Sequence, residues 1–280
     1  MNDDSPFAHS DAVLSPLERR RLRFRKIPIR VILPNLVTLL ALAMGLTAIR
    51  YAVEGKFETA VLAVMAAAVL DGLDGRLARA LKGTTRFGAE LDSLADFVDF
   101  GVAPGLLLYF WALHNVSSFG WFATLAFAIA AALRLARFNV TAEEPAKPAW
   151  QSDFFVGMPS PAGAVTVLLP LYLHLSALEL PASKWLAPVF VVYELGVAFL
   201  MASRIPHFSG KRLPKLEREQ IIPLLFAAGV ALVLLATYPM EMLAGLSLCY
   251  LASIPFGVRR FNALAREDSS KVAGNSAPPA

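Results

Sequence analysis

The stretch that decides the fold reads DGLDGRLARALKGTTRFGAELDSLAD and runs from Asp71 to Asp96. It places four aspartates at helical spacing on two successive segments, inside a chain dominated by long apolar runs. Ionisable side chains within a membrane are costly and usually mark a functional site. The stretch therefore predicts two neighbouring helices that carry an acidic site close to a membrane surface.

The composition is typical of an integral membrane protein. Hydrophobic residues make up 56% of the 280 residues and the mean hydropathy is +0.55, which is more than a soluble domain needs. A span takes about 20 apolar residues, and in lipid a helix satisfies its own backbone groups. We therefore predict an all-α polytopic membrane protein with about eight transmembrane helices. The predicted spans are 33–53, 57–77, 87–108, 119–138, 161–178, 186–201, 221–238 and 240–258.

The distribution of Lys and Arg predicts the orientation, because these residues concentrate in cytoplasmic loops. If both termini are cytoplasmic, only Arg50, Lys56 and Lys184 fall on the outer side. An even number of spans is needed for this arrangement, which agrees with eight. No cleavable signal is apparent, since the basic start leads into a full-length span, and we expect the first span to remain in the protein.

The acidic stretch forms two faces that can meet. Residues three, four, seven and eight positions apart lie near one face of a helix. On the first helix of the stretch, counted from Asp71, this face holds Asp71, Asp74, Gly75, Ala78 and Arg79. Asp92, Asp96 and Asp99 follow on the next helix at offsets of four and seven. The connection is short and contains Gly83, so we expect antiparallel neighbours with their acidic ends at the cytoplasmic surface.

Clustered carboxylates predict a metal site, because they cannot all stay ionised without compensation and suit hard cations such as Mg²⁺ or Mn²⁺. The lone Cys249 excludes a cysteine-based site. Gly75 and Ala78 leave room for a phosphorylated ligand to approach the helix, and Arg79 offers a fixed fork for phosphate oxygens. These parts together indicate phosphoryl-group transfer. For any single aspartate, a helix cap or a solvated face is the alternative.

The spacing DxxDGxxARx8GxxxDxxxD resembles the signature of the CDP-alcohol phosphotransferase family, membrane enzymes that transfer a phosphatidyl or phosphoalcohol unit from a cytidine diphosphate donor to an alcohol. The resemblance implies two ions, Mg²⁺ or Mn²⁺, one held by Asp71, Asp74 and Asp92 and the other by Asp71, Asp92 and Asp96. It also implies that Asp96 is the general base and that Gly75, Arg79 and Thr85 contact the CDP group. A six-helix core and a homodimer are implied as well.

The acceptor alcohol is predicted from flanking segments, because the motif itself does not choose between acceptors. These segments resemble the bacterial CDP-diacylglycerol serine O-phosphatidyltransferases, and they are PNLVT (34–38), ELDSLADFVDFGVAP (90–104), RLARFNV (134–140) and GMPSPAGA (157–164). The resemblance implies that CDP-diacylglycerol and L-serine give phosphatidylserine and CMP, at the cytoplasmic face of the bacterial inner membrane. Asp99 departs from the pattern, in which Ser or Asn is usual, so a third acid could alter the site.

Further polar residues are candidates for substrate contacts. Asn35 and Thr38 could reach the cytidine, although a helix start explains Asn35 equally well. A substrate carboxylate or phosphate could be bound by cations and an amide near two cytoplasmic helix ends. These candidates are Arg134, Arg137, Asn139 and Arg204, and for the arginines the alternative is a topology anchor at the membrane surface.

Two other functions stay open on the sequence. Another acceptor, such as glycerol 3-phosphate, would need a stronger cationic pocket. A cation-coupled transporter would also bury carboxylates, but the acids lie in the cytoplasmic third and no paired interrupted helices appear. Membrane lipid is an expected partner and nucleic acid is not.

The predicted organisation has five parts. They are a basic tail that could hold an interfacial helix (1–32), the family core (33–203), a basic cytoplasmic loop (204–220), two additional spans (221–258) and a disordered cytoplasmic tail (259–280).

Overall fold

Helices make up almost the whole of the part of the chain that the computed structural model describes, which is residues 29–142, 154–208 and 218–275. Most of the predicted basic tail (1–32) and most of the predicted loop (204–220) lie outside it, while residues 29–32 belong to the first helix. In chain order the helices are α2 (Ile29–Val53), α3 (Phe57–Ala80), α4 (Arg86–Asp96), η1 (Phe97–Val102), α5 (Ala103–Trp111), η2 (Leu113–Val116), α6 (Ser118–Ala142), α7 (Ser160–Val167), α8 (Leu169–Leu175), α9 (Ala187–Ala202), α10 (Arg218–Thr237) and α11 (Pro239–Asn275). The predicted all-α class is confirmed.

Each predicted span falls on helix, but not every helix is long and apolar enough to cross a membrane by itself. Five segments of the described chain meet that criterion, namely Ile29–Val53, Arg86–Trp111, Ser118–Thr141, Glu219–Thr237 and Pro239–Asp268. The shorter α9 is apolar, α3 carries the acidic motif, and the segment predicted at 161–178 is divided at Leu168 into α7 and α8. The protein is therefore a multi-pass membrane protein, and the count of eight spans stays a prediction.

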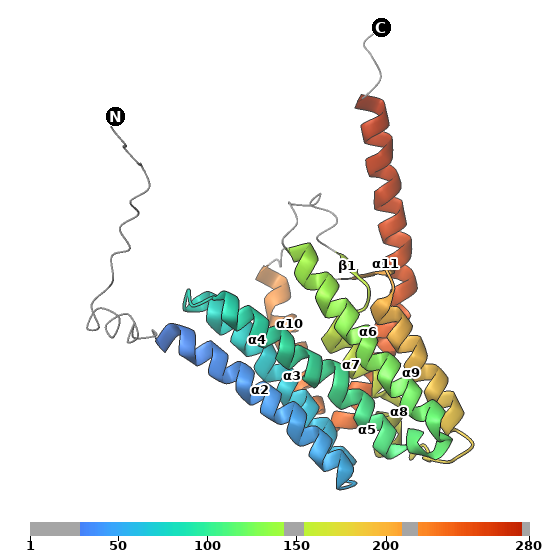
Figure 1. Ribbon diagram of the computed structural model, residues 1–280. Coiled ribbons are helices and arrows are strands. Elements are labelled where there is room, and N and C mark those ends of the chain that lie inside the picture. The colour runs from blue at the N-terminus through green and yellow to red at the C-terminus, as the bar shows by residue number, and fades with distance from the viewer. Residues whose placement is uncertain (1–28, 143–153, 209–217, 276–280) are drawn as a thin grey trace, which may run out of the picture.

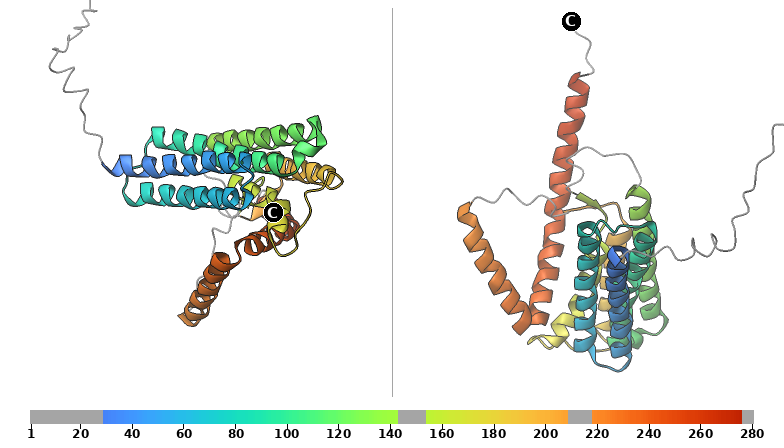
Figure 2. Two further views of the ribbon diagram at one scale, coloured as in Figure 1. Left: turned by 90° about the horizontal axis from the view of Figure 1, so that it is seen from below. Right: turned by 90° about the vertical axis from the view of Figure 1, so that its left-hand side faces the viewer.

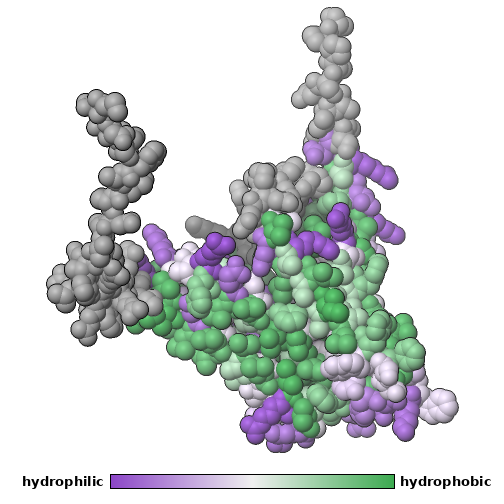
Figure 3. All heavy atoms as spheres, in the orientation of Figure 1, coloured by the Kyte–Doolittle hydropathy of each residue, from purple (hydrophilic) through white to green (hydrophobic). Residues whose placement is uncertain are grey.

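The surface of the bundle is apolar around its middle. Figure 3 shows hydrophobic side chains covering the flank of the helices, with hydrophilic residues gathered toward the two ends. Large apolar side chains such as Val69, Phe122 and Val192 are more than half exposed. Soluble proteins do not expose apolar surface on this scale, so lipid is the natural neighbour of this flank.

The helices pack around a shared apolar core. α2 packs most extensively against α3 and also contacts α4, η1 and α5, while α6 packs against α9 (Figure 1). Small side chains such as Ala48, Ala60 and Ala131 are fully buried between them and let the backbones approach closely. Larger side chains, among them Leu107 and Phe127, fill the centre of the bundle.

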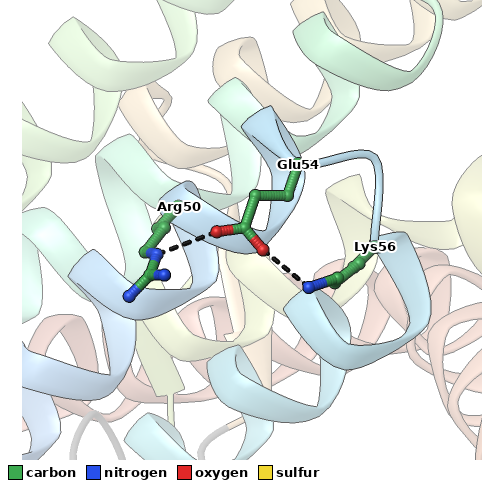
Figure 4. A network of polar contacts seen from close by, with 3 residues as sticks. All are labelled: Arg50, Glu54 and Lys56. Carbon is green, nitrogen blue, oxygen red and sulfur yellow. Dashed lines mark hydrogen bonds and ion pairs between the residues drawn. The ribbon is translucent and has the colours of Figure 1, made fainter.

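The turn between α2 and α3 lies at the end of the bundle away from the acidic motif. Glu54 accepts from Arg50 Nε at 2.9 Å and from Lys56 Nζ at 2.8 Å (Figure 4). Both hydrogen bonds lower the pKa of Glu54, and the bond from Lys56 has the larger effect. Asp71 is 14 residues beyond the start of α3, which corresponds to about 21 Å along the helix.

The C-terminal helices extend away from the bundle. α10 is exposed along its whole length and meets α11 at the turn between them (Figure 2). α11 packs against α7, α8 and β2 and then projects beyond the other helices. It ends at Asn275, so residues 259–275 are helical where we predicted a disordered tail. A helix that is already formed extends easily through residues such as Ala, Arg, Glu and Lys, because the costly nucleation step is past.

A short two-stranded antiparallel sheet, which the sequence did not predict, lies beside α11. β1 (Phe154–Val156) pairs antiparallel with β2 (Pro206–Phe208), with Phe154 opposite Phe208. The sheet joins the segment before α7 to the segment after α9, and β2 contacts α11. It therefore holds the ends of three helices in one place.

Candidate active site

The turn between α3 and α4 is fixed by an unusual contact with α2. Pro34 lies inside α2 and has no N–H, so the carbonyl group of Arg30 receives no bond from it. Gly83 lies against that carbonyl group, and a Cβ at this position would come within 2.8 Å of the Arg30 carbonyl carbon. Thr85 then caps α4 by accepting from Gly88 N at 3.0 Å. Glycine at 83 is needed for this close approach.

Three aspartates converge where α3 and α4 face each other. Asp71, Asp74 and Asp92 each present a carboxylate oxygen, and these oxygens lie within 4.8 Å of one another. Asp96 joins them, since its carboxyl group lies close to that of Asp71. Its Oδ1 atom is buried without a hydrogen-bond partner. The structure thus brings the four predicted metal ligands into one cluster.

Thr38 connects this cluster to α2. Its hydroxyl group donates to Asp74 Oδ2 at 2.6 Å, and both side chains are buried. Because the Thr38 hydroxyl holds the Asp74 carboxylate, its orientation toward the other aspartates is set by a protein group before any ligand binds.

Asp99 extends the acidic face into the bundle. It lies in η1, a π-helix in which each turn holds an additional residue, and such turns are frequent at functional sites. Its carboxyl group is buried against Gly45 of α2, where a Cβ would come within 2.9 Å of Asp99 Cγ. The sequence singled out Asp99 but did not indicate its neighbour.

A cleft of about 160 Å³ opens beside the aspartates, between α2, α3 and α4. All six residues predicted to bind the donor line it, and they are Asn35, Thr38, Gly75, Ala78, Arg79 and Thr85. It is also lined by Asp74 and Asp92, and by Pro34, Gly83, Thr84, Gly88 and Ala89, which the prediction did not include. The run of small residues in GTTRFGA (83–89) was the signal that could have indicated Gly83, Thr84, Gly88 and Ala89. The cleft can therefore hold a phosphorylated ligand next to the acidic cluster.

The residues predicted to bind serine or phosphate are placed differently from one another. Arg134 of α6 is buried, donates from Nη1 to Ser160 Oγ at 2.7 Å, and lies within electrostatic reach of Asp96. Arg137 instead donates to the carbonyl groups of Ala202 and Ser203, at 2.7 and 2.8 Å. Arg137 therefore caps the C-terminal end of α9.

The other two candidates lie at the surface. Asn139 is exposed and donates from Nδ2 to Ser93 Oγ at 3.1 Å, which connects the end of α6 to α4. Arg204 is exposed just beyond α9. Ser160, which the sequence analysis quoted without assigning a role, is the polar residue that meets Arg134. Its position next to two prolines in an apolar run was the signal that could have found it.

The donor set fits a hard divalent cation. Carboxylate oxygens are the ligands that Mg²⁺ and Mn²⁺ prefer, and the cluster offers three of them within 4.8 Å together with the unpartnered Oδ1 of Asp96. Four carboxyl groups this close repel one another unless protons or cations compensate them. The cluster is thus a candidate metal site.

Comparisons with known proteins identify related sequences. The family model described as CDP-alcohol phosphatidyltransferase matches residues 31–202, and a second one, CDP-alcohol phosphatidyltransferase 2, matches residues 219–255. The chain is similar to the CDP-diacylglycerol–serine O-phosphatidyltransferase of Mycobacterium leprae, with 40% identity over 235 residues that cover 81% of this chain and 74% of the relative.

Relatives with the same name occur in other bacteria. The protein of Helicobacter pylori strain J99 is 39% identical over 177 residues, which cover 62% of this chain and 72% of the relative. The protein of Bacillus subtilis is 33% identical over 189 residues, which cover 66% of this chain and 96% of the relative.

Proposed function

Because the chain belongs to the CDP-alcohol phosphatidyltransferase family, we propose that it transfers the phosphatidyl group from CDP-diacylglycerol to L-serine, which yields phosphatidylserine and CMP. Relatives of 33 to 40% identity carry the name of this activity. The observation that carries the proposal is the junction of two sites at Asp96. Asp96 lies close to Asp71 of the acidic cluster, which adjoins the cleft, and the buried Arg134 lies within electrostatic reach of Asp96.

The donor binds in the cleft between α2, α3 and α4. Gly75 and Ala78 leave the α3 backbone accessible, and the exposed Arg79 offers its guanidinium group to phosphate oxygens. Asn35 of α2 and Thr85 at the start of α4 also line the cleft, and their amide and hydroxyl groups suit a nucleotide. The exposed apolar flank of the helices leaves the diacylglycerol chains in lipid.

Two divalent ions, Mg²⁺ or Mn²⁺, complete the site in this proposal. Asp71, Asp74 and Asp92 hold one, and Asp71, Asp92 and Asp96 hold the other. When bound, the ions neutralise charge on the phosphate oxygens of the donor. Thr38 keeps the Asp74 carboxylate in position for this role.

Asp96 is the general base of the proposed reaction. It takes the proton of the seryl hydroxyl group, whose oxygen forms a bond to the phosphorus that carries diacylglycerol. The bond between that phosphorus and the oxygen of CMP breaks, and CMP leaves with its phosphate next to Arg79. Arg134 binds the serine carboxylate, because it is a buried cation close to Asp96. No covalent enzyme intermediate is needed for this displacement.

The proposed location is the bacterial cytoplasmic membrane, with both termini and the active site on the cytoplasmic side. Exposed cations gather at the end of the bundle that holds the cleft, and they include Arg30, Arg76 and Arg86. The opposite end of the same helices carries Arg50 and Lys56 in a network with Glu54. This asymmetry is typical of the positive-inside distribution. A homodimer, which the family resemblance implies, belongs to the same proposal.

The experiment that tests the proposal measures CMP release by the purified protein with CDP-diacylglycerol and Mn²⁺ or Mg²⁺. L-Serine, glycerol 3-phosphate, inositol phosphate and choline are supplied separately. We expect metal-dependent CMP release with serine only, and phosphatidylserine as the lipid product. Release with glycerol 3-phosphate instead would refute the acceptor, and cation flux in sealed vesicles without release would favour a transporter.

Two variants test the division of roles among the aspartates. Asp96→Asn should abolish CMP release but retain binding of CDP-diacylglycerol, because the proposed base acts on the acceptor. Asp71→Asn should lose both, because Asp71 is proposed to hold both ions. Equal loss of donor binding in the two variants would contradict this assignment.

A further inference from the structure

The buried Arg134 has an incomplete set of partners. Its Nη1 donates to Ser160, but its Nε is buried without a hydrogen-bond partner. Within the described parts of the chain, no carboxylate lies within 4.0 Å of its guanidinium group. A buried cation without a close anion is costly, so this position is suited to an anion that arrives with a substrate.

Tyr250 of α11 lies within electrostatic reach of the same guanidinium group. Its place follows from the packing of α11 on α7, where Ser247 Oγ donates to the carbonyl group of Val165 at 3.1 Å. The two helices lie side by side, and Tyr250 is nearly one turn beyond Ser247, on the stretch of α11 that also reaches His207. α11 follows the residues that the main family model matches, 31–202.

His207 of β2 holds the Tyr250 side chain in place. The two rings are stacked with their centroids 5.8 Å apart and an interplanar angle of 11°, and Tyr250 Oη lies 3.0 Å from His207 Nδ1. The imidazole is buried, and burial lowers the pKa of His207 to about 4, so the ring is neutral at pH 7. Tyr250 is thus fixed by a neutral partner from the two-stranded sheet.

The tautomer of His207 decides where the phenol proton points. Its Nε2 is buried without a partner, and a proton there would be an unpaired buried N–H, which native structures rarely contain. The proton therefore belongs on Nδ1, from which it is donated to the Tyr250 oxygen. A phenol that accepts this bond keeps its own proton for a second acceptor.

We propose that Tyr250, positioned by His207, forms with Arg134 a second half of the acceptor site that recognises the carboxylate of an α-amino acid. This inference rests on the proposed function and adds a specificity-determining residue from α11. A guanidinium group and a phenol hydroxyl that converge on one anion favour a planar carboxylate. Tyr250 then selects serine over acceptors that lack a carboxylate, and Asp96 receives the hydroxyl proton as before.

The test compares Tyr250→Phe with wild type in CMP release, with KM measured separately for L-serine and for CDP-diacylglycerol. Loss of a hydrogen bond to a charged group predicts a rise in the serine KM of about tenfold or more, with the donor KM unchanged. His207→Phe keeps a stacked ring without the hydrogen bond and should raise the serine KM less. Tyr238→Phe is the matched control, because Tyr238 is exposed just before α11, and it should match wild type.

A second readout separates carboxylate recognition from a packing effect. L-Serinamide lacks the carboxylate, so its inhibition constant should be the same for wild type and Tyr250→Phe. Equal weakening of serine and serinamide, a raised KM for CDP-diacylglycerol, or an unchanged serine KM would each overturn the inference. If wild type releases no CMP with serine, the proposed function fails first, and the inference fails with it.

Discussion

Replacing Thr38 with valine should weaken metal activation of CMP release by about 10- to 100-fold. The Thr38 hydroxyl donates to Asp74 Oδ2 at 2.6 Å, and Thr38 and Asp74 are only 4% and 3% exposed. A hydrogen bond to a charged group contributes about 1.5–3 kcal/mol, and about 1.4 kcal/mol corresponds to a factor of ten. Partners of metal ligands usually contribute about 10- to 100-fold in metal affinity.

The assay titrates Mg²⁺ or Mn²⁺ at saturating CDP-diacylglycerol and serine. Thr38→Ser should restore the wild-type activation constant, because it returns the hydroxyl group. Thr47→Val is the control on the same helix, since the Thr47 hydroxyl is exposed and donates only within α2, to the carbonyl group of Ala43 at 2.6 Å. An unchanged metal activation constant in Thr38→Val, with a raised KM for CDP-diacylglycerol, would refute the reasoning and assign Thr38 to the nucleotide.

Three further changes test the scaffold around the site. Gly83→Ala should destabilise the protein by about 1–3 kcal/mol, because the new Cβ would overlap the Arg30 carbonyl group. Thermal unfolding in detergent measures this loss of stability. Gly72→Ala is the control, because a Cβ there meets open space, and it should be neutral or stabilising. Arg137→Lys should lower the unfolding temperature and leave the serine KM unchanged, because lysine lacks the planar fork with which Arg137 donates to two carbonyl groups at the end of α9. A raised serine KM at unchanged stability would return Arg137 to the acceptor site. Glu54→Gln should lower the unfolding temperature at pH 7. The difference from wild type should shrink as the pH falls below 4.5 toward the lowered pKa of Glu54, because protonation removes the charge that Lys56 and Arg50 stabilise. A difference in unfolding temperature that is constant down to acid pH would contradict this.

The fold class and the acidic cluster could be predicted because both depend on local periodicity. Apolar runs of spanning length indicate helices whatever their neighbours are. The offsets between Asp71 and Asp74, and between Asp92 and Asp96, place each pair on one face of its helix. A short connection through Gly83 then makes the two faces neighbours, so the position of the cluster required no knowledge of the rest of the bundle.

Contacts between distant segments could not be predicted in this way. Tyr250 and His207 are 43 positions apart in the chain, and Arg137 and Ser203 are 66 apart. Periodicity assigns a side chain to a face of its helix but does not say which element covers that face. Arg137 was therefore grouped with Arg134 as a candidate for substrate binding, although its guanidinium group caps α9 in the structure.

The π-helix η1 also sets the rotation of one half of its span relative to the other. A π-turn accommodates one residue more than an α-turn, and one residue of an α-helix corresponds to a rotation of about 100°. Deleting a single residue between Phe97 and Val102 would keep a continuous span but turn Asp92 and Asp96 away from α3, while α5 stayed in the core. The register of this helix is therefore part of the catalytic apparatus. A chain that lacks one residue here would be inactive even though it retained every aspartate.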